Sequence, residues 1–100
     1  MLTHETIIKK IEANLGKIKG YGVKRIGLFG SYTRDEQKAE SDIDILVEFE
    51  KAQKTFDNYM DLKFFLEDLF KRKVDLVIVE AIKPDLKFYI MGSVRYASGV

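Results

Sequence analysis

The chain has 100 residues, of which 46% are hydrophobic and 33% charged, a composition typical of one small globular domain rather than a disordered chain. The 17 basic and 16 acidic residues leave a net charge of +1, which argues against a direct, sequence-independent nucleic-acid binder. Cysteine is absent, so disulfides and thiolate metal sites are excluded, and no apolar run approaches membrane-spanning length. Residues 1–10 lack the apolar core of a signal peptide, so we expect a cytoplasmic protein.

The first half of the chain predicts a helix followed by two strands. Apolar residues at helical spacing indicate an amphipathic helix over residues 3–18, which ends at the glycines of residues 20–22. A short strand over Val23–Phe29 then leads into a turn at Gly30-Ser31, and a helical turn with a loop is expected over residues 32–40. The apolar run of Ile43–Phe49 predicts the second strand.

The second half predicts helix, strand, helix. Thr55 is a candidate N-cap for a helix over residues 56–70, where apolar residues again recur at helical spacing. Residues 74–79 predict a third strand, and Pro84 starts a final helix that runs toward Arg95. We therefore expect a single domain over residues 1–100 of the α+β class, with a small mixed β-sheet of three or four strands and helices packed on one face.

Three acidic residues fall on neighbouring strands of this expected sheet. Asp42 and Asp44 are two residues apart, which places both carboxylates on one strand face, and Asp75 belongs to the third strand. Adjacent like charges favour a bound cation, and carboxylate ligands favour Mg²⁺ or Mn²⁺. The alternatives are ordinary surface acids at positions 42 and 44 and, for Asp75, an edge-strand charge or a salt bridge to Arg72.

The turn after the first strand is a candidate phosphate site. Gly30 allows close approach of the backbone, Ser31 offers a hydroxyl, and Arg34 could pair with a phosphate. A plain strand-ending turn is the alternative for Gly30-Ser31, and an ion pair with Asp35 or Glu36 is the alternative for Arg34. Together with the acids, this turn indicates metal-dependent nucleotidyl or phosphoryl transfer.

At these residues the chain resembles the minimal nucleotidyltransferase (MNT) branch of the DNA polymerase beta-like nucleotidyltransferase superfamily. The matching segments are Gly27–Arg34, Ser41–Val47 and Lys73–Val77. The resemblance implies the polymerase beta-like fold, a nucleotide-binding role for Gly30 and Ser31, and two Mg²⁺ ions bound by Asp42 and Asp44. It also implies that Asp75 is the third catalytic and metal-binding acid.

The same resemblance implies a function and a partner. MNT proteins commonly act beside a HEPN-domain toxin, so this chain is expected to transfer AMP from ATP to a hydroxyl of that toxin, on a tyrosine, and to act as its antitoxin in a heteromeric complex. One alternative is a non-catalytic antitoxin that neutralises the toxin by binding alone. Another is nucleotidyl transfer to a small molecule such as an aminoglycoside, for which the chain lacks an acceptor domain.

Overall fold

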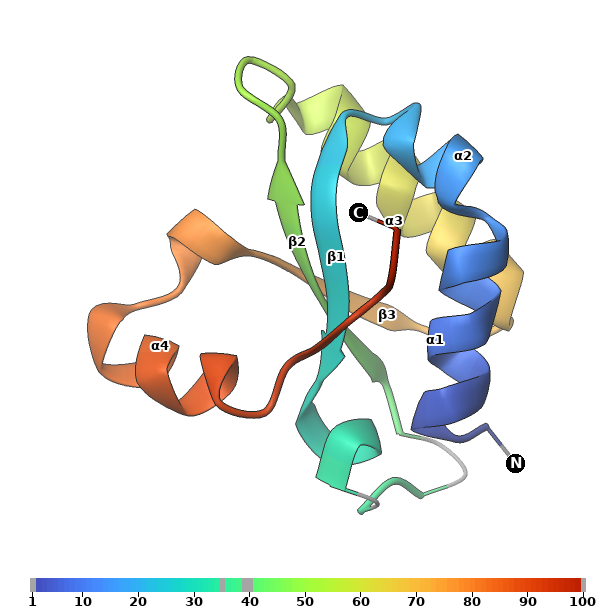
Figure 1. Ribbon diagram of the computed structural model, residues 1–100, viewed down its shortest axis with the longest axis vertical. Helices are drawn as coiled ribbons and strands as arrows, with labels where there is room; N and C mark the ends of the chain where they lie inside the picture. The colour runs from blue at the N-terminus through green and yellow to red at the C-terminus, as the bar shows by residue number, and fades with distance from the viewer. Residues whose placement is uncertain (1, 35, 39–40, 100) are drawn as a thin grey trace.

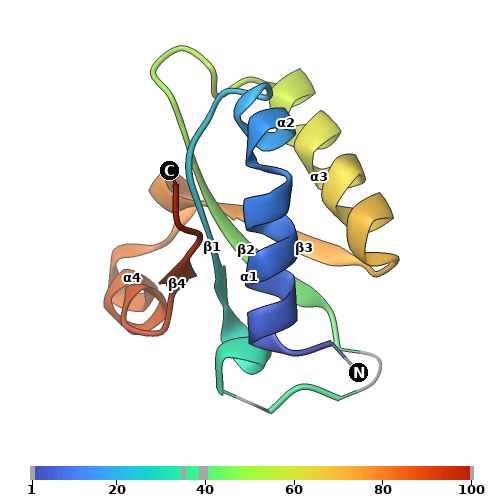
Figure 2. The same ribbon diagram turned by 45° about the vertical axis from the view of Figure 1, so that its right-hand side comes forward.

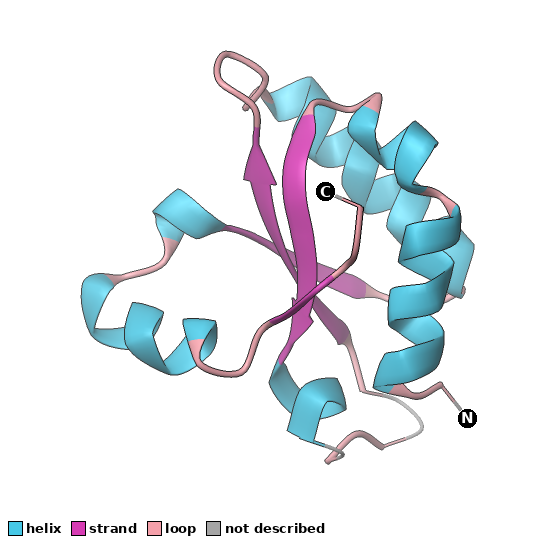
Figure 3. Ribbon diagram, in the orientation of Figure 1, coloured by secondary structure: helices cyan, strands magenta, loops and turns pink. Residues whose placement is uncertain are grey.

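A mixed four-stranded sheet forms the centre of the protein, in a computed structural model that describes residues 2–34, 36–38 and 41–99 (Figures 1 and 3). The strands are β1 (Val23–Phe29), β2 (Ile43–Phe49), β3 (Val74–Ile78) and β4 (Arg95–Tyr96), in the order β3-β2-β1-β4. β1 is antiparallel to β2 and β4, whereas β2 and β3 are parallel. The predicted α+β class with a mixed sheet is confirmed.

The helices α1 (His4–Ala13), α2 (Leu15–Lys19) and α3 (Phe56–Phe70) cover one face of the sheet (Figures 1 and 2). Alternate residues of β2, starting at Ile43, point toward these helices and are buried in the core. The helices contribute the apolar residues of their inner faces to the same core, namely Ile7, Ile11, Ile18, Leu62, Leu66 and Phe70. The intervening residues of β2, which include Asp44, therefore lie on the opposite face of the sheet.

Local capping residues set the helix boundaries in this layer. The Thr55 side chain accepts a hydrogen bond from the Asn58 backbone N–H at 3.1 Å, which confirms the predicted start of α3. The single helix predicted over residues 3–18 is wrong in one respect, because it divides at Asn14 into α1 and α2. The Asn14 side chain donates to the Lys10 carbonyl at 2.8 Å and so satisfies the end of α1.

The C-terminal part of the chain departs most from the prediction. The helix α4 (Pro84–Met91) begins at the proline as expected, but it ends before Gly92 instead of continuing toward Arg95. Residues 95 and 96 leave the helix because they pair with Leu28 and Gly27 of β1 as strand β4. The third strand is also one residue shorter than predicted, since a 3₁₀ turn, η2 (Val79–Ala81), follows β3.

No residue of α4 is buried, and α4 lies on the other side of the sheet from α1 and α3 (Figure 2). Within the part of the chain that the structure describes, none of the helices has the length and apolar character needed to cross a bilayer.

Candidate active site

Asp44 and Asp75 occupy matching positions on neighbouring strands. The parallel pairing of β2 with β3 places their Cα atoms opposite each other, and both side chains lie on the sheet face away from the helical layer. Asp42 is exposed and precedes β2 by one residue. The structure thus brings two of the three predicted acids side by side, with the third at the start of the same strand.

Asp44 carries the strongest electrostatic perturbation at this site. Partial burial, followed by the negative charges of Asp75 and Asp42, raises the pKa of the Asp44 carboxyl from 3.8 to about 6, and the charge of Arg34 lowers it in part. These acids are therefore close enough to repel one another. A bound cation would relieve that repulsion.

The turn after β1 packs directly against the Asp44 carboxylate. Phe29, the last residue of β1, pairs with Asp44, and the following Gly30 has a φ of +80°. A Cβ atom at Gly30 would lie 2.2 Å from Asp44 Oδ2, so only glycine allows both the left-handed backbone and this close approach. The helical turn predicted within residues 32–40 is present but begins two residues earlier, as the 3₁₀ helix η1 (Gly30–Arg34). The Thr33 hydroxyl donates to the Gly30 carbonyl at 2.8 Å.

Arg34 ends this turn and forms an ion pair with Glu36, one of the two alternatives that its position in the sequence left open. The pKa of the Arg34 guanidinium is raised, first by its hydrogen bond to Glu36 and then by the charges of Glu36, Tyr89 and Asp44. Arg34 is exposed, and a phosphate would have to compete with Glu36 for its guanidinium. Asp35, the other predicted ion-pair partner, lies outside the described residues.

Two tyrosines support the strands that carry the acids, a role that the sequence pattern did not predict for either of them. The hydroxyl of the buried Tyr32 donates to the Ser41 carbonyl at 3.5 Å, next to Asp42. On α3, the Tyr59 hydroxyl donates to the Leu76 carbonyl at 2.6 Å, next to Asp75. Burial and then the charge of Asp75 raise the pKa of Tyr59. An aromatic residue at core spacing predicts burial, but it does not reveal which carbonyl its hydroxyl reaches.

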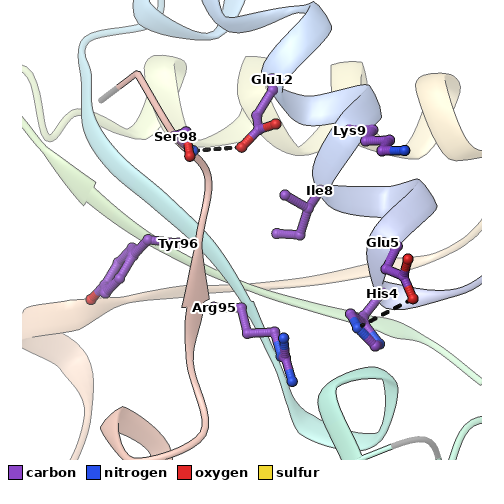
Figure 4. Close-up of a pocket in the computed structure, with 8 residues that line it drawn as sticks. All are labelled: His4, Glu5, Ile8, Lys9, Glu12, Arg95, Tyr96 and Ser98. Carbon is purple, nitrogen blue, oxygen red and sulfur yellow. Dashed lines mark hydrogen bonds and ion pairs between the residues drawn. The ribbon is translucent and has the colours of Figure 1, made fainter.

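The structure also contains a pocket of about 320 Å³ between α1 and β4 (Figure 4). Its lining residues are His4, Glu5, Ile8, Lys9, Glu12, Arg95, Tyr96 and Ser98. The Ser98 backbone N–H donates to Glu12 at 2.6 Å and links the two sides (Figure 4). None of these residues is one of the predicted site residues, so this pocket is separate from the acidic face of the sheet.

Whether the acids suit Mg²⁺ depends on how much of the coordination sphere the protein must supply. Among the residues that the structure describes, no group of three or more acidic, histidine or cysteine side chains is already arranged to hold a metal. Mg²⁺ usually binds to one or two carboxylates together with substrate phosphates and water, rather than to an all-protein cage. The oxygen donors of Asp44 and its acidic neighbours fit an ion that is shared with a nucleotide, and their assignment as ligands stays a prediction.

Paired aspartates on a mixed sheet, beside a glycine–serine turn, are typical of enzymes that transfer nucleotidyl or phosphoryl groups. The family model described as "Nucleotidyltransferase domain" matches residues 7–97. The chain therefore belongs to the nucleotidyltransferase family, and the resemblance to its minimal branch is confirmed by the relatives that follow.

The chain is similar over nearly its whole length to the protein adenylyltransferase MntA of Thermococcus cleftensis, with 37% identity over 97 residues that cover 96% of this chain and 97% of MntA. A solved structure assigned as a minimal nucleotidyltransferase has a TM-score of 0.81 and 32% identity, and the match covers 94% of this chain and 95% of that one. A toxin–antitoxin structure with AMP-PNP gives a TM-score of 0.69 and 25% identity, over 89% of this chain and 73% of that one.

Proposed function

We propose that this nucleotidyltransferase transfers AMP from ATP to a tyrosine hydroxyl of a paired HEPN toxin, with Mg²⁺, and so acts as an antitoxin. The name of the Thermococcus relative supports AMP transfer to a protein, and the toxin–antitoxin structure with AMP-PNP supports an adenine nucleotide and a toxin partner. The HEPN class of the partner and the tyrosine acceptor come from the resemblance to MNT proteins.

One observation carries the catalytic proposal: Asp44 lies between Asp75 on the next strand and Gly30 in the turn. A triphosphate held at the turn by Gly30 and Ser31 would lie beside these carboxylates. The guanidinium of Arg34, once released from Glu36, would add a positive charge for the phosphates.

The three acids then divide two roles in the transfer, metal binding and proton acceptance. Asp42 and Asp44 would hold two Mg²⁺ ions, and Asp75 would complete the site and accept the proton of the attacking hydroxyl. Bound Mg²⁺ supplies charge neutralisation on the phosphates and alignment of the attacking and leaving oxygens. The raised pKa of Asp44 matches this role, because a carboxylate crowded by other negative charges gains more from a nearby cation.

The test is to incubate the chain with ATP, Mg²⁺ and the product of the neighbouring reading frame, and to measure the mass of that product. We expect a gain of one or more AMP groups with the native chain and none with Asp44→Asn. Asp61→Asn is the matched control, because Asp61 is an exposed acid on α3, which packs on the opposite face of the sheet, and this variant should retain transfer.

The same experiment separates catalysis from binding alone. If the neighbouring protein forms a stable complex with the chain and is neutralised by Asp44→Asn as well as by the native chain, the antitoxin acts by binding and the catalytic proposal is wrong. If a small-molecule acceptor such as an aminoglycoside gains AMP and the protein does not, the proposed acceptor is wrong.

A further inference from the structure

Tyr89 on α4 differs from every other tyrosine of the chain in its accessibility. The chain has five tyrosines, all within the described residues, and only Tyr89 is exposed, at 76%. The hydroxyls of Tyr32 and Tyr59 donate to backbone carbonyls, and Tyr32 is buried. Tyr96 is partly buried, with its hydroxyl 4.0 Å from the Met91 sulfur.

The remaining tyrosine, Tyr21, is partly buried and belongs to the helical layer. Its ring packs against Phe65 of α3, with the centroids 6.0 Å apart. Tyr89 is thus the one tyrosine of this chain whose phenol is exposed and makes no described hydrogen bond, so its oxygen is available as a nucleophile.

Tyr89 also lies on the side of the sheet that carries the acids. α4 lies on the face away from α1 and α3 (Figure 2), and the alternation of buried residues in β2 places Asp44 on that face as well. Arg34 links the two, since the Asp44 carboxylate and the ionised form of the Tyr89 phenol both favour the charged state of its guanidinium and raise its pKa. The phenol therefore shares a side of the sheet with the acids and lies within electrostatic range of the guanidinium that is a candidate ligand of the triphosphate.

We propose that Tyr89 is a self-modification site, whose phenol accepts a nucleotidyl group within the same molecule when no partner acceptor is present. This inference rests on the proposed function, which supplies the nucleoside triphosphate and the activated site. The Tyr89 oxygen attacks the α-phosphorus of the triphosphate and a new O–P bond forms. The bond from that phosphorus to the bridging oxygen breaks, pyrophosphate leaves, and the phenolic proton passes to a nearby carboxylate or to water.

The modification would limit the activity of the chain itself. An AMP group on Tyr89 adds a negatively charged phosphodiester within electrostatic range of Arg34, where it would compete with the phosphates of the next nucleotide. A chain modified in this way would bind ATP more weakly than an unmodified chain. The partner toxin would prevent this outcome by supplying a better-placed hydroxyl.

The test uses the full chain alone with ATP and Mg²⁺, followed by intact-mass and peptide mass spectrometry. We expect a gain of one AMP on the peptide that contains Tyr89, at the same rate over a tenfold range of protein concentration. Tyr89→Phe should abolish the gain and Tyr96→Phe, a partly buried tyrosine of the same sheet face, should retain it. Asp44→Asn should abolish it without changing Tyr89.

Three results would overturn the proposal. A gain of AMP that persists in Tyr89→Phe would assign the modification to another residue. AMP on Asp44→Asn chains mixed with active Tyr89→Phe chains would show transfer between molecules. No gain on the chain, under conditions where the partner protein is modified, would refute self-modification while the proposed function stands.

Two further outcomes relate this proposal to the proposed function. If neither the chain nor the partner gains AMP, both proposals fail. If Tyr89→Phe modifies the partner at the native rate but no longer modifies itself, Tyr89 is an acceptor and not part of the catalytic machinery.

Discussion

Gly30→Ala tests whether the turn must lie directly against Asp44. Alanine at a φ of +80° costs about 1–2 kcal/mol from the left-handed backbone alone. Its Cβ would also lie 2.2 Å from Asp44 Oδ2 and 3.0 Å from Asp44 Cγ, so the carboxylate must move away from the turn. Because a displacement of about 1 Å at a reacting centre can cost ~100-fold in rate, we expect a loss of that order in AMP transfer.

Gly22→Ala is the matched control for this experiment. Gly22 has a φ of +86°, and its added Cβ would lie 2.5 Å from Gln53 Cβ, so it combines similar backbone strain with a close contact. Gly22 is at the opposite end of β1 from the acids. Both variants should lower the melting temperature, by about 5–15 °C for this size of domain, while only Gly30→Ala loses transfer in assays well below melting. Equal activity of the two variants would refute the requirement for glycine beside Asp44.

Two further predictions concern the charges of the site. In metal-free protein, the raised pKa of Asp44, about 6, means that its contribution to stability is fully present below pH 4 and is lost as the pH rises through 6. Asp44→Asn should therefore raise the free energy of unfolding at pH 7, by about 1 kcal/mol after allowance for solvent screening, and should leave it unchanged near pH 3.5. Denaturant titration at both pH values measures the free energy of unfolding of the native chain and of the variant. Added Mg²⁺ should stabilise the native chain more than the variant. Equal stability of the two at pH 7 would contradict the inference that Asp44 is repelled by the neighbouring acids. For Arg34, which is paired with Glu36, we expect Arg34→Gln to raise the KM for ATP several-fold and Glu36→Gln to leave it equal or lower. Steady-state kinetics on both variants measures the KM for ATP. An unchanged KM in Arg34→Gln would show that Arg34 forms its ion pair with Glu36 but does not bind the nucleotide.

The elements that local pattern determines were predictable from the sequence. The bounds of β1, β2 and α3 agree with the prediction, because long apolar periodic segments and a capping threonine specify them. The motif segments also identified Gly30, Asp44 and Asp75 as one neighbourhood, since consecutive strands tend to pair. Their roles in binding nucleotide and metal stay predictions.

Features that depend on distant contacts were not predictable in the same way. β4 has two residues, too few for a periodic signal, and it exists because it pairs with β1 about 70 positions earlier in the chain. A signal was present in Gly27, a glycine inside a strand, which often marks the close approach of another backbone. A Cβ at Gly27 would lie 2.9 Å from the Arg95 carbonyl oxygen, so the glycine makes room for β4.

The helix α4 has no buried residue, so the two sides of the sheet differ in how well they tolerate amino-acid substitutions. A substitution in α4 removes little apolar contact, so it costs little folding free energy, whereas the core positions of β2 are constrained by close packing. Local opening of α4 would likewise require less free energy than global unfolding. The surface on the acidic side of the sheet can therefore change through substitutions in α4 while the strands that hold the acids stay fixed.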